Sequence, residues 1–590
     1  MMHNPFRMYK RKVVKKATLS AIFLCLIVAG CSLFGKRVSS PPPVVAEEVP
    51  REALYHYLVG RQKLKEGKLS EALKEYQEAL SLDPQSAFLH TELAHIFLRQ
   101  GKMEEVLFSC REALSVDPDY LPARRLLAGV LSSMGRRKEA IEEYERILKA
   151  DPLDFKAYIM LGSLYVELKA YEKAIKTVQK LLEKKPDSVM GLYYLARIYA
   201  EMKLYGKAIE CYKKVLEIHP HMEAALMEMA TIYEIEGKTE EAVRTYKELL
   251  KHHPHNIQAR ERLGVLLLKE ERLEEALKQY RIIKQLDSEN LAVRMRLGLI
   301  LLQQEKYREA EEEFRFVLGA RPENHRVRFY LGMTLYEMGE VEKAVEELKK
   351  IPPEASVYVD TIKYLAYILQ KEGRVEEALQ VVKEALRKKP TDWEIEYALA
   401  LLYEEMKRYE EAVRILEGLV KKASKPAEVL FRLGVISDKM GQKERCLEYM
   451  RKAIEADPKH ADALNWVGYT YAEEGIRLDE AEELIKRALE VKPNSGYIID
   501  SLGWVYYKKG KLKEALFYLQ KAHRLLPDDP TITEHLGDVF LKMGDEGKAL
   551  ELYRRAMDLK PTDEQRKKIQ MKIERLLKKR QDAKGDPDHL

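Results

Sequence analysis

The 590-residue sequence is poor in several residue types and motifs that define other classes of protein. It has only five cysteines, which excludes a scaffold held together by disulfides. Three of them, Cys110, Cys211 and Cys446, lie far apart in the chain, and we interpret them as small buried hydrophobic residues. The sequence has no Gly-rich phosphate loop, His-Glu-x-x-His pair, Cys-x-x-Cys pair or Gly-x-Ser-x-Gly elbow. We therefore expect neither enzymatic activity nor a bound cofactor.

An excess of charge of one sign is also lacking from most of the chain. There are 102 Lys+Arg against 96 Asp+Glu, which makes a formal net charge of +6. Six positive side chains and no acidic one lie in residues 1–30, so residues 31–590 carry 96 charges of each sign. This balance removes the compositional case for a nucleic-acid partner.

The longest apolar run near the start, residues 17–30, is shorter than the ~20 residues that a membrane-spanning helix needs. A basic stretch from Arg7 to Lys16 precedes it, and it ends in Ala-Gly followed by Cys31. This arrangement resembles the lipobox of bacterial lipoproteins. The alternatives are an uncleaved anchor and a cysteine placed there by coincidence. The resemblance implies that residues 1–30 are a signal peptide and that Cys31 receives a diacylglyceryl group. Ser32, rather than Asp, implies the outer membrane, facing the periplasm, or the outer face of the cytoplasmic membrane in a host with one membrane.

The segment after that cysteine, residues 31–52, has no helical period and contains Pro41-Pro42-Pro43. Proline imposes an extended backbone, so this segment is predicted to be a semi-rigid tether.

A period of 34 residues runs through the rest of the chain. Prolines recur at this spacing or at twice this spacing, at Pro84, Pro118, Pro152, Pro186, Pro220, Pro254, Pro322, Pro390 and Pro458. Within each period the eighth place is Gly or Ala, the twentieth is Ala in most units, and the fifteenth is often Gly. Small residues let two helices approach closely, Gly ends the first helix in a left-handed cap, and Pro ends the second. Each unit is thus predicted to be two amphipathic helices joined by a short turn.

This pattern resembles the tetratricopeptide repeat (TPR). The resemblance implies an all-α, right-handed superhelical solenoid of fifteen repeats over residues 53–563. The repeats are predicted to begin near residues 53, 87, 121, 155, 189, 223, 257, 291, 325, 359, 393, 427, 461, 496 and 530. A solenoid needs caps at its ends, and residues 564–580, with Ile569, Ile573 and Leu576 on one side, are predicted to form the C-terminal one. Residues 581–590 are predicted to be a disordered tail.

In TPR arrays, five places of the first helix face the concave groove, and two stretches of this groove stand out. The middle stretch is apolar, with Leu268, Met295, Leu299, Leu302, Phe329, Met333 and Tyr336. It is either a surface for an apolar helix or extended segment, or a place where the superhelix packs on itself. The C-terminal stretch mixes aromatic and polar residues, namely Asn465, Tyr469, Tyr497, Asp500, Trp504, Tyr507, Glu534 and Asp538. It is either a protein-binding patch or a solvated Tyr-rich face.

Histidines gather in two neighbouring turns, as His219-Pro220-His221 and as His252-His253-Pro254-His255. Imidazoles from adjacent repeats could bind Zn, Ni or Cu. The sequence places no carboxylate or cysteine beside them by any motif, so we interpret them as incidental turn residues and predict no metal site.

These observations predict a non-enzymatic scaffold, tethered to the membrane by its lipid, that binds proteins or peptides and neither nucleic acid nor a small-molecule substrate. The C-terminal segment resembles a family of long TPR lipoproteins of the bacterial envelope. Some members of that family are partners of carboxyl-terminal-processing proteases, and others belong to exopolysaccharide export. The resemblance implies an adaptor, and the expected role is to present substrates to a periplasmic protease. The alternative is a structural component of an envelope secretion or pilus system.

Overall fold

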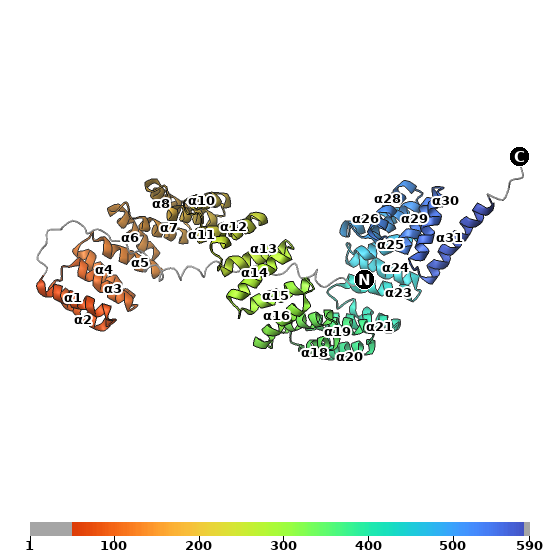
Figure 1. The fold of residues 1–590 in the computed structure, drawn as a ribbon, viewed down its shortest axis with the longest axis horizontal. Coiled ribbons are helices and arrows are strands. Elements are labelled where there is room, and N and C mark those ends of the chain that lie inside the picture. Colours follow the sequence, from red (N-terminus) through yellow and green to blue (C-terminus); the bar gives the residue numbers. More distant parts are fainter. Residues whose placement is uncertain (1–49, 583–590) are drawn as a thin grey trace. The chain divides into compact units, whose positions relative to one another are not determined.

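The computed structural model describes residues 50–582, and within this range it contains 31 α-helices and no strand (Figure 1). The all-α solenoid of helix pairs predicted from the sequence is confirmed. Cys31, the predicted signal peptide, the predicted tether up to residue 49 and residues 583–590 lie outside the described residues. None of the described helices combines the length and the apolar character that crossing a bilayer requires.

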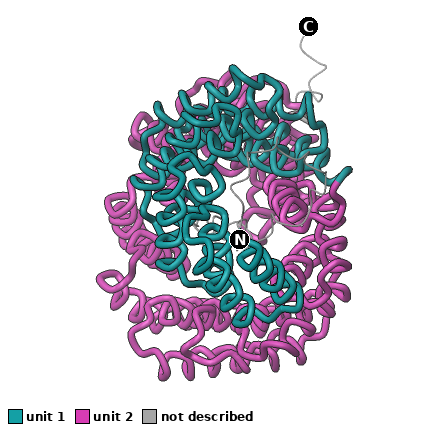
Figure 2. Tube along the Cα trace, turned by 90° about the vertical axis from the view of Figure 1, so that its left-hand side faces the viewer, with its two compact units in different colours: residues 1–252 teal, residues 253–590 magenta. Residues whose placement is uncertain are grey.

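The chain divides into two compact units, residues 1–252 and residues 253–590, coloured separately in Figure 2. The described part of unit 1 consists of α1 (Arg51–Lys65), α2 (Leu69–Leu82), α3 (Ala87–Arg99), α4 (Met103–Val116), α5 (Leu121–Ser133), α6 (Arg137–Ala150), α7 (Phe155–Glu167), α8 (Tyr171–Lys184), α9 (Val189–Glu201), α10 (Tyr205–Ile218), α11 (Glu223–Ile235) and α12 (Thr239–His252).

Unit 2 continues the same alternation and ends in a longer helix. Its helices are α13 (Ile257–Lys269), α14 (Leu273–Leu286), α15 (Leu291–Gln303), α16 (Tyr307–Ala320), α17 (His325–Glu337), α18 (Val341–Lys349), α19 (Tyr358–Lys371), α20 (Val375–Lys388), α21 (Trp393–Glu405), α22 (Tyr409–Leu419), α23 (Pro426–Lys439), α24 (Lys443–Ala456), α25 (Ala461–Glu474), α26 (Leu478–Val491), α27 (Gly496–Lys508), α28 (Leu512–Leu525), α29 (Pro530–Lys542), α30 (Glu546–Asp558) and α31 (Asp563–Asp582). Each first helix begins no more than two residues from the position expected from the period.

The turn inside each helix pair has the same backbone conformation whether or not its residue is glycine. Ten turns have Gly at positive φ, for example Gly339 at 78°. Five others have a charged residue at the same place of the repeat, namely Lys169, Lys203, Glu271, Glu305 and Lys407, with φ of 57–60°. A non-Gly residue tolerates this left-handed conformation only at some cost in free energy. The packing of the two helices therefore imposes the turn, and glycine only makes it easier to form.

The two helices of a pair meet where the small eighth residue of the first lies against a large side chain of the second. At Gly298, an added Cβ would lie 2.5 Å from the ring of Phe314, which is completely buried. The same place of the second helix holds Tyr76, Tyr212, Tyr246, Tyr280 and Tyr553, all among the largest fully buried side chains. In these six pairs one ring thus covers a residue with little or no side chain, and in others a large aliphatic side chain takes its place, as Leu348 does against Gly332.

A recurring arginine near the start of the first helix joins the turn before it to the second helix. In α15, Arg294 donates to the Ser288 carbonyl at 2.8 Å and to the Glu313 carboxylate at 2.9 Å. Three other repeats place an arginine the same way, namely Arg124, Arg260 and Arg328. The arginine satisfies a carbonyl that the preceding helix end leaves without an intrahelical partner.

Within unit 2, first helices approach the first helices of the next repeat, as α19 does α21 and α25 does α27. The second helices of neighbouring repeats approach one another less closely. The repeats are therefore wedge-shaped, narrow at the first helices, and a stack of such wedges curves with the first helices on its inner side. Unit 2 follows a curved path (Figure 2).

Candidate partner-binding surfaces

The C-terminal groove residues predicted from the sequence lie on α25, α27 and α29, and most of them are not open to solvent. Asp500, Trp504, Glu534 and Asp538 are buried, each 5–8% exposed. Asn465, Tyr469 and Tyr507 are half-buried. Of the eight, only Tyr497 is exposed, at 44%.

Trp504 forms the centre of this group, between two rings. His535 of α29 stacks on the indole with a centroid distance of 3.9 Å and an interplanar angle of 15°. Tyr507, one turn further along α27, also stacks with it at 4.7 Å and 11°. The indole Nε1 donates to the Glu473 carboxylate at the end of α25. Trp504 therefore ties three successive first helices together.

His535 was not among the predicted site residues, because the sixth place of a repeat is not one that faces the groove. Its Nδ1 lies 3.0 Å from Oδ1 of Asp500, and both side chains are buried. Burial by itself lowers the pKa of His535. The negative charges of Asp500, Asp538 and Glu534 raise this pKa by more than burial lowers it, so it lies above its ordinary value. The only signal in the sequence was its position between two of the predicted acidic residues, Glu534 and Asp538.

The two acidic residues of α29 are paired with the chain's own C-terminal helix. Lys572 of α31 lies 2.7 Å from a Glu534 carboxylate oxygen and 2.7 Å from an Asp538 carboxylate oxygen. Tyr553 donates to Asp538 at 2.5 Å, and Gln565 of α31 donates to Glu534 at 3.1 Å. Two carboxylates of the predicted protein-binding patch are therefore already in contact with an intramolecular cation. Ile569, Ile573 and Leu576 of α31 are buried against α30 in the same region.

The middle stretch of predicted groove residues is more exposed. Leu302 and Met333 are buried, and the other five, Leu268, Met295, Leu299, Phe329 and Tyr336, are half-buried. Burial of part of this set reflects packing between successive first helices.

The structure extends this stretch with two tyrosines of α19. Tyr364 lies 5.8 Å from Phe329 and 6.1 Å from Tyr336 between ring centroids, in edge-on contacts. Tyr367 stacks on Tyr364 at 6.1 Å and meets the edge of Tyr336 at 6.5 Å. We call Phe329, Tyr336, Tyr364 and Tyr367 the aromatic stripe; all four rings are half-buried. Burial raises the pKa of Tyr336 and of Tyr364, so their phenols are neutral donors at pH 7.

Several family profiles match the chain, all of one kind. Profiles described as tetratricopeptide repeat or TPR repeat match residues 60–101, 97–161, 133–198, 369–430, 427–460, 498–529 and 533–567. A profile described as the tetratricopeptide repeat protein 21 C-terminal ARM domain matches residues 172–331. A TPR repeat-containing protein of Pseudomonas aeruginosa is 46% identical over 66 residues, which are 11% of this chain and 11% of that protein.

Two solved structures have a low overall similarity to this chain. The yeast Tom70 structure is 16% identical, covers 91% of this chain and 98% of its own, and has a TM-score of 0.32. The Cut9–Hcn1 structure is 15% identical, covers 82% and 95%, and has a TM-score of 0.36. Likenesses of this size carry no information about partners. The helix pairs, the 34-residue period and the matching profiles together show that the chain is a tetratricopeptide repeat protein.

Proposed function

We propose that this protein is a non-enzymatic scaffold that binds partner proteins or peptides along the inner side of unit 2. The aromatic stripe is the observation that carries the proposal. Four rings from two successive first helices contact one another there, and each keeps part of its surface in solvent. Rings held by their neighbours lose little conformational entropy on binding, which is why aromatic side chains dominate the binding energy of many interfaces.

The chemistry of the stripe favours an apolar helix or extended segment as its ligand. Phe329 offers only apolar surface, and the three tyrosines add phenol groups that can donate to backbone carbonyls of a peptide. Lys363, beside Tyr364, is held by Asp360 at 3.1 Å and by Glu394. A lysine that already pairs with two carboxylates attracts an acidic ligand less strongly. Apolar contact is therefore the main contribution of this surface to the free energy of binding.

The C-terminal group serves the scaffold in a different way. Because Trp504, Asp500 and His535 are buried and paired with one another, they hold α25, α27 and α29 in a fixed arrangement. In this region a partner would contact the exposed ring of Tyr497 and the half-buried ring of Tyr507.

The scaffold is further proposed to be anchored in the bacterial envelope through a lipid on Cys31, on the periplasmic side of the outer membrane. Within that setting we propose an adaptor that presents substrates to a periplasmic protease. Mass spectrometry of the mature N-terminus tests the anchor: a diacylated Cys31 supports it, and an unmodified one removes it. Deletion of the gene separates the adaptor from a secretion component. Accumulation of a cell-wall hydrolase in the deletion strain supports the adaptor. Loss of exopolysaccharide or pilus export with normal hydrolase levels supports the secretion component instead.

Site-specific crosslinking in cells tests the binding surface. A photoreactive phenylalanine derivative replaces Tyr367 in one strain and Phe517, an exposed residue of the outer helix α28, in another. We expect a discrete crosslinked protein from position 367 and not from position 517. Tyr336→Ala with Tyr367→Ala is expected to lower recovery of that partner at least tenfold, with an unchanged circular dichroism spectrum. Equal crosslinking at both positions, or recovery unaffected by the double variant, contradicts the proposed surface.

A further inference from the structure

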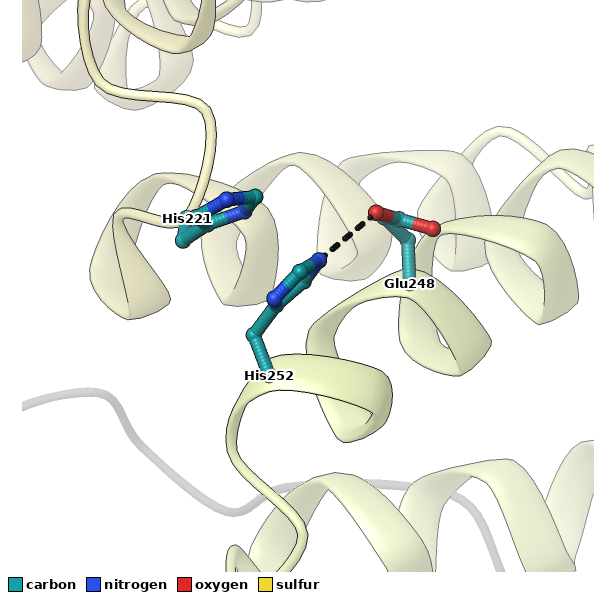
Figure 3. A group of neighbouring side chains, drawn as sticks. All are labelled: His221, Glu248 and His252. Carbon is teal, nitrogen blue, oxygen red and sulfur yellow. Dashed lines mark hydrogen bonds and ion pairs between the residues drawn. The ribbon is translucent and has the colours of Figure 1, made fainter.

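Two histidines and a glutamate come together at the C-terminal end of α12. His221 lies in the turn between α10 and α11, and Glu248 and His252 lie in the last two turns of α12 (Figure 3). The imidazole rings of His221 and His252 stack with a centroid distance of 3.5 Å and an interplanar angle of 24°. Nε2 of His252 is 3.1 Å from Oε1 of Glu248. One possible ligand atom from each residue lies within 4.8 Å of the other two.

In the sequence, no motif places a carboxylate beside these histidines, which is why it predicts no metal site. The structure provides one from the same helix, because residues four apart in a helix share a face and Glu248 precedes His252 by one turn. The third group, His221, comes from the preceding repeat and reaches the same place because successive repeats stack. Neither the period nor the local sequence shows this meeting of two repeats.

We propose that His221, Glu248 and His252 bind a divalent transition-metal ion of the Zn²⁺ type. Two imidazoles and one carboxylate form a ligand set that zinc uses with a fourth position open to water. The site also lies at the C-terminus of α12, where the helix dipole and the last carbonyls favour a cation. The open position makes the ion a place where a side chain of a partner protein can bind.

The geometry leaves room for an ion and for its movement into place. Adjacent ligands around tetrahedral zinc are about 3.3 Å apart for bonds of about 2.0 Å. Nε2 of His252 and Oε1 of Glu248 are already 3.1 Å apart, and ligand atoms of the three residues lie within 4.8 Å of one another, so the largest closure needed is about 1.5 Å. His221 is exposed and Glu248 is about half exposed, so rotation of their side chains achieves this without moving the helix. A recess of about 370 Å³, lined by His219, Met222 and Val189 among others, borders His221 and gives access to water ligands.

Isothermal titration of the full-length chain without a histidine tag tests the site. We expect one Zn²⁺ or Ni²⁺ bound per chain and no binding of Mg²⁺, which prefers oxygen ligands. His252→Ala and His221→Ala are each expected to weaken binding on the order of 10- to 100-fold. His219→Ala is the matched control, two residues from His221 but outside the group, and should leave the affinity within a factor of two.

Two further measurements distinguish this site from metal bound elsewhere on the chain. X-ray absorption of the zinc complex should show two imidazoles and a carboxylate in the first coordination shell. Glu248→Gln should remove the carboxylate and weaken Zn²⁺ binding, and lowering the pH from 7.5 to 5.5 should also weaken it, because protons compete for the imidazole nitrogens. An affinity unchanged by His252→Ala and His221→Ala, or no Zn²⁺ binding at pH 7.5, overturns the proposal.

Discussion

The ammonium group of Lys572 on α31 lies 2.7 Å from the carboxylate of Asp538 on α29. The helix that closes the solenoid thus places a cation between two acidic residues of the last first helix, since Glu534 is also 2.7 Å from Lys572. Both carboxylates are buried, so they need this cation or a substitute for it.

Removal of that cation is expected to loosen the C-terminal cap. In Lys572→Ala the carboxylates of Glu534 and Asp538 keep their tyrosine and glutamine donors but lose the cation that forms an ion pair with each of them. We expect the free energy of unfolding of this region to fall by about 2 kcal/mol. The loss is no larger because Lys572 is partly exposed, so the ion pairs are not fully desolvated. Amide hydrogen exchange along α31 measures it. Lys568→Ala, which removes an exposed ion pair with Glu564 on the same helix, should change exchange by under about 0.5 kcal/mol. Equal effects of the two changes would contradict the assigned role of Lys572.

Stability is expected to fall in acid partly through Glu482. Burial raises the pKa of Glu482, but hydrogen bonds from Lys486, Lys509 and Tyr506 outweigh it and lower this pKa to about 2. Since the folded pKa is depressed, the stabilisation is complete above the unfolded pKa of about 4.3 and is lost as the pH falls towards 2. Urea unfolding should show wild type about 2 kcal/mol more stable than Glu482→Gln at pH 7, and the gap should narrow between pH 4 and pH 2.

A neighbouring glutamate provides the control for that titration. Glu480 lies on the same helix and forms a longer contact, 3.5 Å, with the exposed Arg477. Glu480→Gln should change stability little at any pH. If the difference in stability between wild type and Glu482→Gln does not depend on pH, lost packing rather than lost charge causes that difference.

His535 is expected to contribute to stability with the opposite pH dependence, so that its contribution is lost as the pH rises. Its raised pKa means that the stabilisation from its pairing with Asp500 is complete below the unfolded imidazole pKa of about 6.5 and is lost as the pH rises through the folded value. Hydrogen exchange of α29 should therefore show a larger difference between wild type and His535→Gln at pH 6 than at pH 9. The exposed His95 of α3 is the control, and its change to Gln should have no effect at either pH. A difference that grows with pH would mean that the histidine is neutral in the folded protein.

Two glycines in first helices are expected to respond in opposite ways to an added methyl group. In Gly298→Ala the new Cβ lies 2.5 Å from the Phe314 ring, which is completely buried and cannot move freely, so about 1–3 kcal/mol of stability should be lost. At Gly129, within α5, nothing lies within 4 Å of the added atom. Gly129→Ala should therefore stabilise its helix by about 0.5–1 kcal/mol, through helix propensity alone. Hydrogen exchange of α15 and α5 measures the two effects locally, and a stabilising Gly298→Ala would show that the helices separate easily.

The C-terminal and middle surfaces illustrate how far the sequence could predict the binding sites. The 34-residue period placed Trp504 and Phe329 on first helices, because the place of a residue in the repeat determines which helix it belongs to. It did not show that His535 covers Trp504, or that Tyr364 joins Phe329, since both partners stand at the sixth place, which the groove pattern omits. Contacts between repeats depend on how far one pair turns relative to the next, and a period contains no such information.

By itself, the sequence determined the helices and turns, because their causes lie within one repeat: a small residue at the eighth place that lets the two helices pack, a left-handed turn at the fifteenth and a proline after the second helix. Only the tertiary structure decided which charged and polar side chains remain available to a partner. Lys572 neutralises Asp538 from a helix 34 residues further along, and Glu248 meets His221 from the next repeat. Such pairs form because the stacking of repeats brings side chains from different repeats together. A buried charge then pairs with whichever opposite charge or polar group lies within reach, because leaving it unpaired costs free energy.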